Sequence, residues 1–102
     1  PLTSGVAKTQ FETFCDVWGP IYVTEVSAEA DFKVYVHEDE AFADVLIFKQ
    51  DQELFADRTG QWYMTSSRGF ARYSVFYVEE EGYADFTVHF TDTESFAGCH
   101  DD

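Results

Sequence analysis

Residues 83–90 read Tyr-Ala-Asp-Phe-Thr-Val-His-Phe, and the rest of the chain repeats the plan of this stretch. An aromatic residue and an Ala-Asp pair come first, and apolar residues then alternate with other residues. The same opening recurs at Phe42-Ala43-Asp44 and at Phe55-Ala56-Asp57. Strict alternation over several residues is typical of a β-strand with one buried face. Each unit is therefore predicted to be one strand with one turn.

The units follow one another at a regular spacing. Their alanines stand at 30, 43, 56, 71, 84 and 97, in steps of 13, 13, 15, 13 and 13. Phe14-Cys15-Asp16 fits the same frame, with Cys in the place of Ala. Each of the two longer steps contains two additional residues that end in a glycine, Gly19 or Gly60. A glycine within a strand pattern is typical of a bulge or a sharp bend.

The rhythm divides the repeat region into two similar halves. The steps of 15, 13 and 13 residues occur twice, over residues 14–55 and again over residues 55–98. We therefore predict a single β-repeat domain over residues 1–102, with residues 1–13 as an N-terminal extension.

The length of the unit predicts how the strands connect. About nine strand residues and four turn residues suit a hairpin-connected strand, and acidic segments such as Glu79-Glu80-Glu81-Gly82 read as turns. Six or seven such strands can close into a small barrel without exposed edges. The predicted fold class is therefore all-β, a six- or seven-stranded antiparallel meander closed into a barrel. The alternative is a β-solenoid in which each unit is one coil.

The two cysteines, Cys15 and Cys99, bear on that choice. In a closed barrel they take inward positions on the first and last strands, which lie side by side, so a disulfide is expected. In a solenoid they lie at opposite ends. A disulfide implies an oxidising compartment, which predicts a secreted or periplasmic protein. Two free buried thiols would instead be ordinary in a cytosolic protein.

The charge of the chain limits its partners. Twenty acidic side chains against six basic ones give a formal net charge of −14. Such a field repels phosphate backbones and anionic lipids, which argues against nucleic-acid binding. No apolar run approaches the ~18 residues of a membrane span, so no membrane insertion is expected. The charge favours a basic protein partner, and it also keeps an aromatic-rich protein soluble.

Five aromatic residues hold equivalent outward positions in successive units. We call them the strand aromatics: Tyr22, Tyr35, Phe48, Tyr63 and Phe76. Lined up on adjacent strands, they would form an interaction stripe, because such rings anchor protein partners and also stack on sugars. The alternative is a second, minor core in which the rings pack over one another and over the turns.

The aspartates that follow the alanines form a second candidate site. Asp31, Asp57 and Asp85 would gather on one rim of an antiparallel barrel. Three carboxylates with nearby carbonyls could hold Ca²⁺, which takes about six to eight oxygens. An aspartate after a turn more commonly bonds to local backbone, so no cofactor is expected. The histidines, His37, His89 and His100, lack the spacing of a zinc site.

Two stretches carry a family resemblance. Lys33-Val34-Tyr35-Val36 and Gly60-Gln61-Trp62-Tyr63, together with the Ala-Asp pairs, are similar to the repeats of a family of small proteins of unknown function. Those repeats read Val-Tyr-Phe-Val and Gln-Ala-Asp, with a central Gly-x-Trp-Tyr element. The resemblance covers residues 19–98, and it implies a small repeat protein without an assigned activity.

The side chains do not predict an enzyme. No arrangement of Ser, His and Asp indicates a nucleophile, and nothing selects one pair of carboxylates from twenty acidic residues. The predicted function is non-catalytic recognition of a protein partner, either a basic protein or an enzyme that it inhibits. The alternative is a structural or carbohydrate-binding module that uses the strand aromatics.

Overall fold

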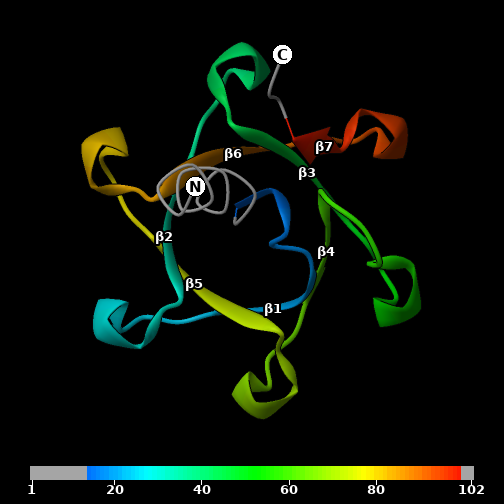
Figure 1. The fold of residues 1–102 in the computed structure, drawn as a ribbon, viewed down its shortest axis with the longest axis horizontal. Coiled ribbons are helices and arrows are strands. Elements are labelled where there is room, and N and C mark those ends of the chain that lie inside the picture. Colours follow the sequence, from blue (N-terminus) through cyan, green and yellow to red (C-terminus); the bar gives the residue numbers. More distant parts are fainter. Residues whose placement is uncertain (1–13, 100–102) are drawn as a thin grey trace, which may run out of the picture.

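The computed structural model describes residues 14–99, so the expected N-terminal extension and His100 lie outside the described residues. Within residues 14–99, seven short strands alternate with six single-turn 3-10 helices (Figure 1). The strands are β1 (Gly19–Val23), β2 (Phe32–Val36), β3 (Val45–Lys49), β4 (Gln61–Met64), β5 (Tyr73–Tyr77), β6 (Phe86–Phe90) and β7 (Gly98–Cys99). The helices are η1 (Ser27–Glu29), η2 (Glu40–Phe42), η3 (Glu53–Phe55), η4 (Arg68–Phe70), η5 (Glu81–Tyr83) and η6 (Glu94–Phe96).

Strands β1 to β6 form a closed parallel barrel. Their order around it is β4-β1-β5-β2-β6-β3, and β3 pairs with β4 to complete the ring. All pairings among these six strands are parallel. The two-residue strand β7 pairs with β3 in the antiparallel sense.

The predicted antiparallel meander is wrong, whereas the all-β class and the closed barrel agree with the structure. In a meander each turn reverses the chain, but here the connections among β1 to β6 restore the original direction, and all of them except the one from β3 to β4 cross the strand that lies between the two they join. Helix η2, which joins β2 to β3, lies against β6, the strand between them. In the same way, η5 joins β5 to β6 and lies against β2. The solenoid is wrong as well, because successive units are not successive coils.

The chain runs twice around the barrel axis. It passes through β1, β2 and β3, and β4 then completes the first circuit (Figure 1). On the second circuit, β5 inserts between β1 and β2, and β6 inserts between β2 and β3. Strands of the two circuits therefore alternate around most of the ring, and most strands bond to partners far away in the sequence.

Each strand is shifted by the same number of residues relative to its neighbour, and this stagger keeps the inward-facing residues aligned from strand to strand. Phe32 pairs with Val75, and Val34 pairs with Phe86. Phe32 and Phe86 each follow their alanine by two residues, whereas Val75 and Val34 follow theirs by four. Equivalent positions are thus displaced by two residues at each step. An even displacement preserves which face points inward, and stagger in a closed sheet tilts the strands.

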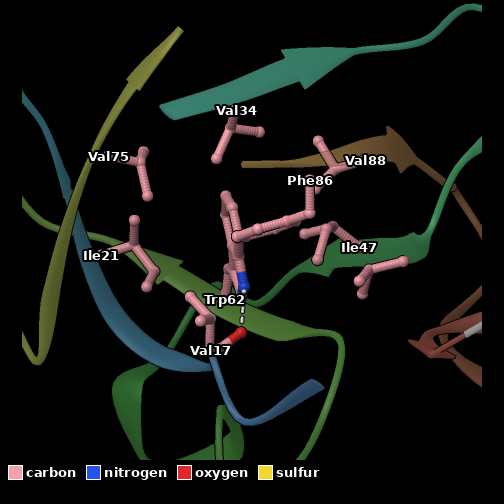
Figure 2. Close-up of a cluster of buried hydrophobic side chains, with 9 residues drawn as sticks. Val17, Ile21, Val34, Ile47, Trp62, Val75, Phe86 and Val88 are labelled. Atoms are coloured by element: carbon pink, nitrogen blue, oxygen red, sulfur yellow. Dashed lines mark hydrogen bonds between the residues drawn. The ribbon is translucent and has the colours of Figure 1, made fainter. Parts of the chain in front are cut away.

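The inward side chains fill the barrel (Figure 2). Trp62 is fully buried, and its Nε1 donates a hydrogen bond to the carbonyl oxygen of Val17 over 2.7 Å. Val17 precedes β1 and is itself buried, so the segment before the first strand contributes to the core. The core comprises Val17, Ile21, Val34, Val45, Ile47, Trp62, Val75, Phe86 and Val88. The strand positions among these residues confirm the inward face expected from the alternation.

Gly60 is the glycine of the second longer step, and it occupies a position that excludes a side chain. Its φ is +84°, in the region that favours glycine. A Cβ atom there would overlap the backbone nitrogen of Gly98 and would lie 2.7 Å from the carbonyl oxygen of Leu46. The additional residues of this step therefore allow the chain to pass close against the paired residues Leu46 of β3 and Gly98 of β7 as it enters β4.

Substitution of Gly60 by alanine tests this close approach. We expect Gly60→Ala to lower the free energy of unfolding by at least about 3 kcal/mol, because backbone strain and steric overlap add. Gly69→Ala is the control, since Gly69 has open space around it and an ordinary φ. Its effect should stay within about 1 kcal/mol. Urea unfolding followed by tryptophan fluorescence measures both, and a small loss for Gly60→Ala would contradict the interpretation.

Candidate functional site

The third residue of five 3-10 helices is an exposed aromatic side chain. These residues, which we call the tip aromatics, are between 50% and 71% exposed: Phe42, Phe55, Phe70, Tyr83 and Phe96. The helices project outward around the barrel, so the rings are spread around its perimeter (Figure 1). The tip aromatics are the aromatic residues of the repeated aromatic-Ala-Asp motif.

Local hydrogen bonds hold each tip in place. In η2, the amide of Phe42 donates to the carbonyl of Asp39, and the carboxylate of Asp39 accepts from the amide of Ala41 at 2.9 Å. Before other tips, a threonine hydroxyl accepts from the amide two residues ahead, at Thr24, Thr65 and Thr91. Such side-chain caps favour tight turns. The turn is therefore fixed locally, while the third side chain stays exposed.

Four of the five aromatic tips begin with a glutamate: Glu40, Glu53, Glu81 and Glu94. A carboxylate thus stands two residues before the ring, within the same helical turn. Glu81 lies 3.6 Å from Nε2 of His37, whose ring packs beside Phe42 with a centroid separation of 5.5 Å. The tips therefore combine negative charge with an accessible aromatic face.

Helices η1 and η4 depart from this pattern together. Helix η1 carries Glu29 where the other helices carry an aromatic residue, and η4 begins with Arg68 instead of glutamate. Arg68 donates from Nη1 to Oε1 of Glu29 over 2.6 Å and from Nη2 to the carbonyl of Glu29 over 3.0 Å. This ion pair joins helices η1 and η4, of which η1 lacks an aromatic tip and η4 keeps Phe70.

The strand aromatics lie on the barrel wall and are half-buried. The stagger separates them, because the residue opposite each ring is another type of residue. Tyr22 pairs with Ser74, and Phe76 pairs with Lys33. The five rings therefore follow one another diagonally around the barrel, and each lies opposite a residue that is not aromatic.

The aspartates after the alanines extend the sheet. Asp31 accepts through Oδ2 from the amide of Ser74 at 2.9 Å, and Asp44 accepts from the amide of Thr87 at 3.0 Å. Asp85 accepts from the amide of Lys33 at 2.8 Å. Each carboxylate thus takes the place of a backbone carbonyl as the acceptor for an amide of a neighbouring strand. The donating residue is 43 or 52 positions away in the sequence. Sequence reasoning considered only local backbone, because the neighbouring strand was unknown.

The structure does not bring Asp31, Asp57 and Asp85 together. Asp57 contacts its sequence neighbour Arg58 at 3.6 Å, and both side chains are exposed. Across residues 14–99, no group of three His, Cys, Asp or Glu side chains is placed to hold a metal ion. The reason is that the three aspartates precede β2, β4 and β6 at separate places around a parallel ring.

Cys15 and Cys99 form a disulfide with Cα atoms 5.5 Å apart, across 84 positions of sequence. This confirms the predicted pairing and is compatible with an extracellular compartment. The expected geometry differs, because β1 and β7 are not neighbours in the sheet. Cys99 pairs with Val45 of β3, and Cys15 lies in the segment that precedes β1.

A family model described as a 7(1) septoil knot domain matches residues 14–100. The chain belongs to the septoil knot family. The description of the family names a knot, and the chain of this barrel runs twice around the barrel axis. The match agrees with the small repeat protein predicted from the sequence, while the specific Val-Tyr-Phe-Val and Gln-Ala-Asp motifs stay a prediction. No curated protein matches the chain.

Each of the helices η1 to η6 of the septoil knot domain is three residues long. In the part of the chain that the structure describes, none is long and apolar enough to cross a membrane.

The carboxylates that extend the sheet of the septoil knot barrel give a direct test of stability. We expect Asp44→Ala to lower the free energy of unfolding by about 1–2 kcal/mol, because the amide of Thr87 loses an acceptor. Asp57→Ala is the control, because it changes the equivalent residue of another unit. Its described ion pair is with the exposed side chain of Arg58. We expect this variant to change the free energy of unfolding by less than about 0.5 kcal/mol. Equal losses in the two variants, measured by urea unfolding, would argue against the role of Asp44.

Proposed function

We propose that this septoil knot protein is a non-catalytic, acidic binding module that recognises a basic protein, such as an enzyme that it inhibits. The observation that carries the proposal is the exposure of five tip aromatics, each on a helical turn held by local hydrogen bonds. Exposed rings on ordered turns match the anchor residues that dominate protein interfaces.

The charge of the chain supports a basic partner. A net charge of −14 accelerates the encounter with a positively charged surface. At four tips a glutamate opens the helical turn that ends in the ring, so a lysine or arginine can contact a carboxylate and an aromatic face together. Attraction and anchoring thus occur at the same places on the surface.

The barrel that carries the tips supports the same proposal. A closed barrel with a disulfide holds the helical turns in defined positions before any partner arrives. Less conformational entropy is then lost on binding, which increases affinity. The tips favour protein recognition over carbohydrate binding by the strand aromatics, since the strand rings are half-buried and each lies opposite a residue that is not aromatic.

The disulfide leads us to propose a secreted or periplasmic location as part of the same function. Alkylation of intact source cells without reductant, followed by mass spectrometry, tests this part. Unmodified, bridged Cys15 and Cys99 are expected, and alkylation of both residues would contradict it.

A charge-neutral triple variant separates recognition by rings from bulk electrostatics. We expect Phe42→Ala/Phe55→Ala/Phe96→Ala to raise the Kd for a short peptide of alternating arginine and serine at least about tenfold, because aromatic anchors supply much of the binding energy. Titration calorimetry measures the Kd, and binding should also weaken as salt rises from about 50 to 500 mM.

The control for this experiment is Val26→Ala/Val36→Ala, which removes exposed apolar groups outside the tips. It should change the Kd by less than about twofold, as surface contacts outside an anchor contribute little. If the triple variant binds as tightly as the wild type, the tips are not the recognition surface and the proposal fails.

A further inference from the structure

One groove on the outside of the barrel combines rings, carboxylates and open space. It lies beside η5, has a volume of about 750 Å³, and is lined in part by Phe76, Tyr83, Lys33, Glu79 and Asp85. Phe76 and Lys33 are opposite one another on β5 and β2. Tyr83, the most exposed of the tip aromatics at 71%, stands on η5.

The charge around this groove is predominantly negative. The chain that joins β5 to η5 contains Glu79 and Glu80, and η5 begins with Glu81. All three are exposed, while Lys33 is the cation among the lining residues. Burial raises the pKa of Tyr77, which also lines the groove, so its hydroxyl stays neutral and adds no charge. Asp85 uses Oδ2 to accept from the amide of Lys33, which fixes its carboxylate in the wall.

Two other grooves have different linings. One of about 370 Å³ beside η6 contains Arg58, Gln61 and Glu94. One of about 180 Å³ beside η4 contains both Arg68 and Arg72. Neither of these two places two aromatic residues beside an excess of carboxylates, as the η5 groove does.

We propose that the η5 groove binds an arginine side chain of the basic partner, stacked on the rings of Tyr83 and Phe76 and paired with the carboxylates of Glu79 and Asp85. The proposal rests on the function proposed above and names the place where its partner is anchored. Arginine suits the groove because its planar guanidinium stacks on aromatic faces and bonds to carboxylates in a fork geometry.

The molecule already uses this kind of contact elsewhere. The guanidinium carbon of Arg72 lies 4.0 Å from the ring centroid of Trp18, and that of Arg68 lies 5.8 Å from the centroid of Tyr22. In the η5 groove the rings are present without an arginine of the chain among the lining residues. An arginine from a partner would complete the same arrangement.

Gly82 provides a way to fill the groove without changing its charge. It is the middle residue of η5 and lines the groove, and a Cβ atom added to it would meet nothing within 4 Å. Leu54 occupies the equivalent position in η3, so this helical turn accepts leucine. Gly69 is the equivalent residue of η4, also has open space, and therefore serves as the matched control.

The test measures binding of the arginine–serine peptide and of the same peptide with citrulline, the neutral analogue, in place of arginine. We expect the wild type to bind the arginine peptide at least tenfold more tightly than the citrulline peptide (about 1.4 kcal/mol). Gly82→Leu and Tyr83→Ala should each raise the Kd at least about fivefold, whereas Gly69→Leu should stay within about twofold. Lys33→Gln should lower the Kd, because it removes the repelling cation.

Each contrary result has a separate meaning. If the arginine peptide binds in a salt-dependent manner but Gly82→Leu and Tyr83→Ala leave the Kd unchanged, the groove proposal is overturned and recognition by the tips stands. If the citrulline peptide binds equally well, or a neutral oligosaccharide displaces the arginine peptide from the groove, the groove is not an arginine site. If the wild type fails to bind the arginine peptide even at low salt, the groove proposal and the proposed function both fail. Thermal unfolding of each variant verifies that it is folded.

Discussion

Parallel pairing between strands of the two circuits is the constraint on which the rest of the structure depends. β5 must find its place between β1 and β2, and β6 must find its place between β2 and β3. Most of the ladder therefore forms between residues that are distant in the sequence. The side chains follow the same rule, since Asp31 and Asp44 bond to residues 43 positions away. Neither circuit alone contains a complete barrel wall.

The constraint also explains the form of the connections. A parallel crossover usually needs a dozen or more residues, but residues 37–44 suffice to join β2 to β3. The two-residue stagger tilts the strands, so the end of one strand lies nearer to the start of the next one in the chain. Each short connection turns in a 3-10 helix, and all except the one between the paired strands β3 and β4 pass over one strand. The exposed rings are carried on these crossings, so the positions of the tips follow from the path of the chain.

The sequence predicted the strands but not their direction. Alternation at Val34, Val45 and Val88 correctly identified the inward face, because period two depends only on one strand and the core. A 13-residue unit, however, is compatible with a hairpin or with a short crossover. The difference lies in which strands are neighbours, and that depends on closure of the whole ring. The disulfide was predicted correctly even though the assumed neighbours were wrong, because the segment before β1, and not β1 itself, brings Cys15 to Cys99 beside β3.

The candidate site was predictable in part. The aromatic-Ala-Asp motif marks the tip residues, but a period of two extended back from each strand places their rings on the same outward face as the strand aromatics. The 3-10 turns separate the two sets, because the turn begins where the strand pattern ends. Two departures in the repeat were a usable signal, namely Glu29 in place of an aromatic residue and Arg68 in place of glutamate. Opposite charges that replace two repeated residues predict a contact between those units, which the structure contains.

The disulfide between Cys15 and Cys99 has a consequence for the topology of the backbone. It turns the polypeptide between them into a covalent circle that holds both circuits of the barrel. The way in which a circle is entangled with itself is a topological invariant, which no motion of its segments can alter. Heat or denaturant can melt every strand of the oxidised protein, yet the entanglement persists in the melted chain. Only a reductant, by opening the circle, gives the ends the freedom to withdraw.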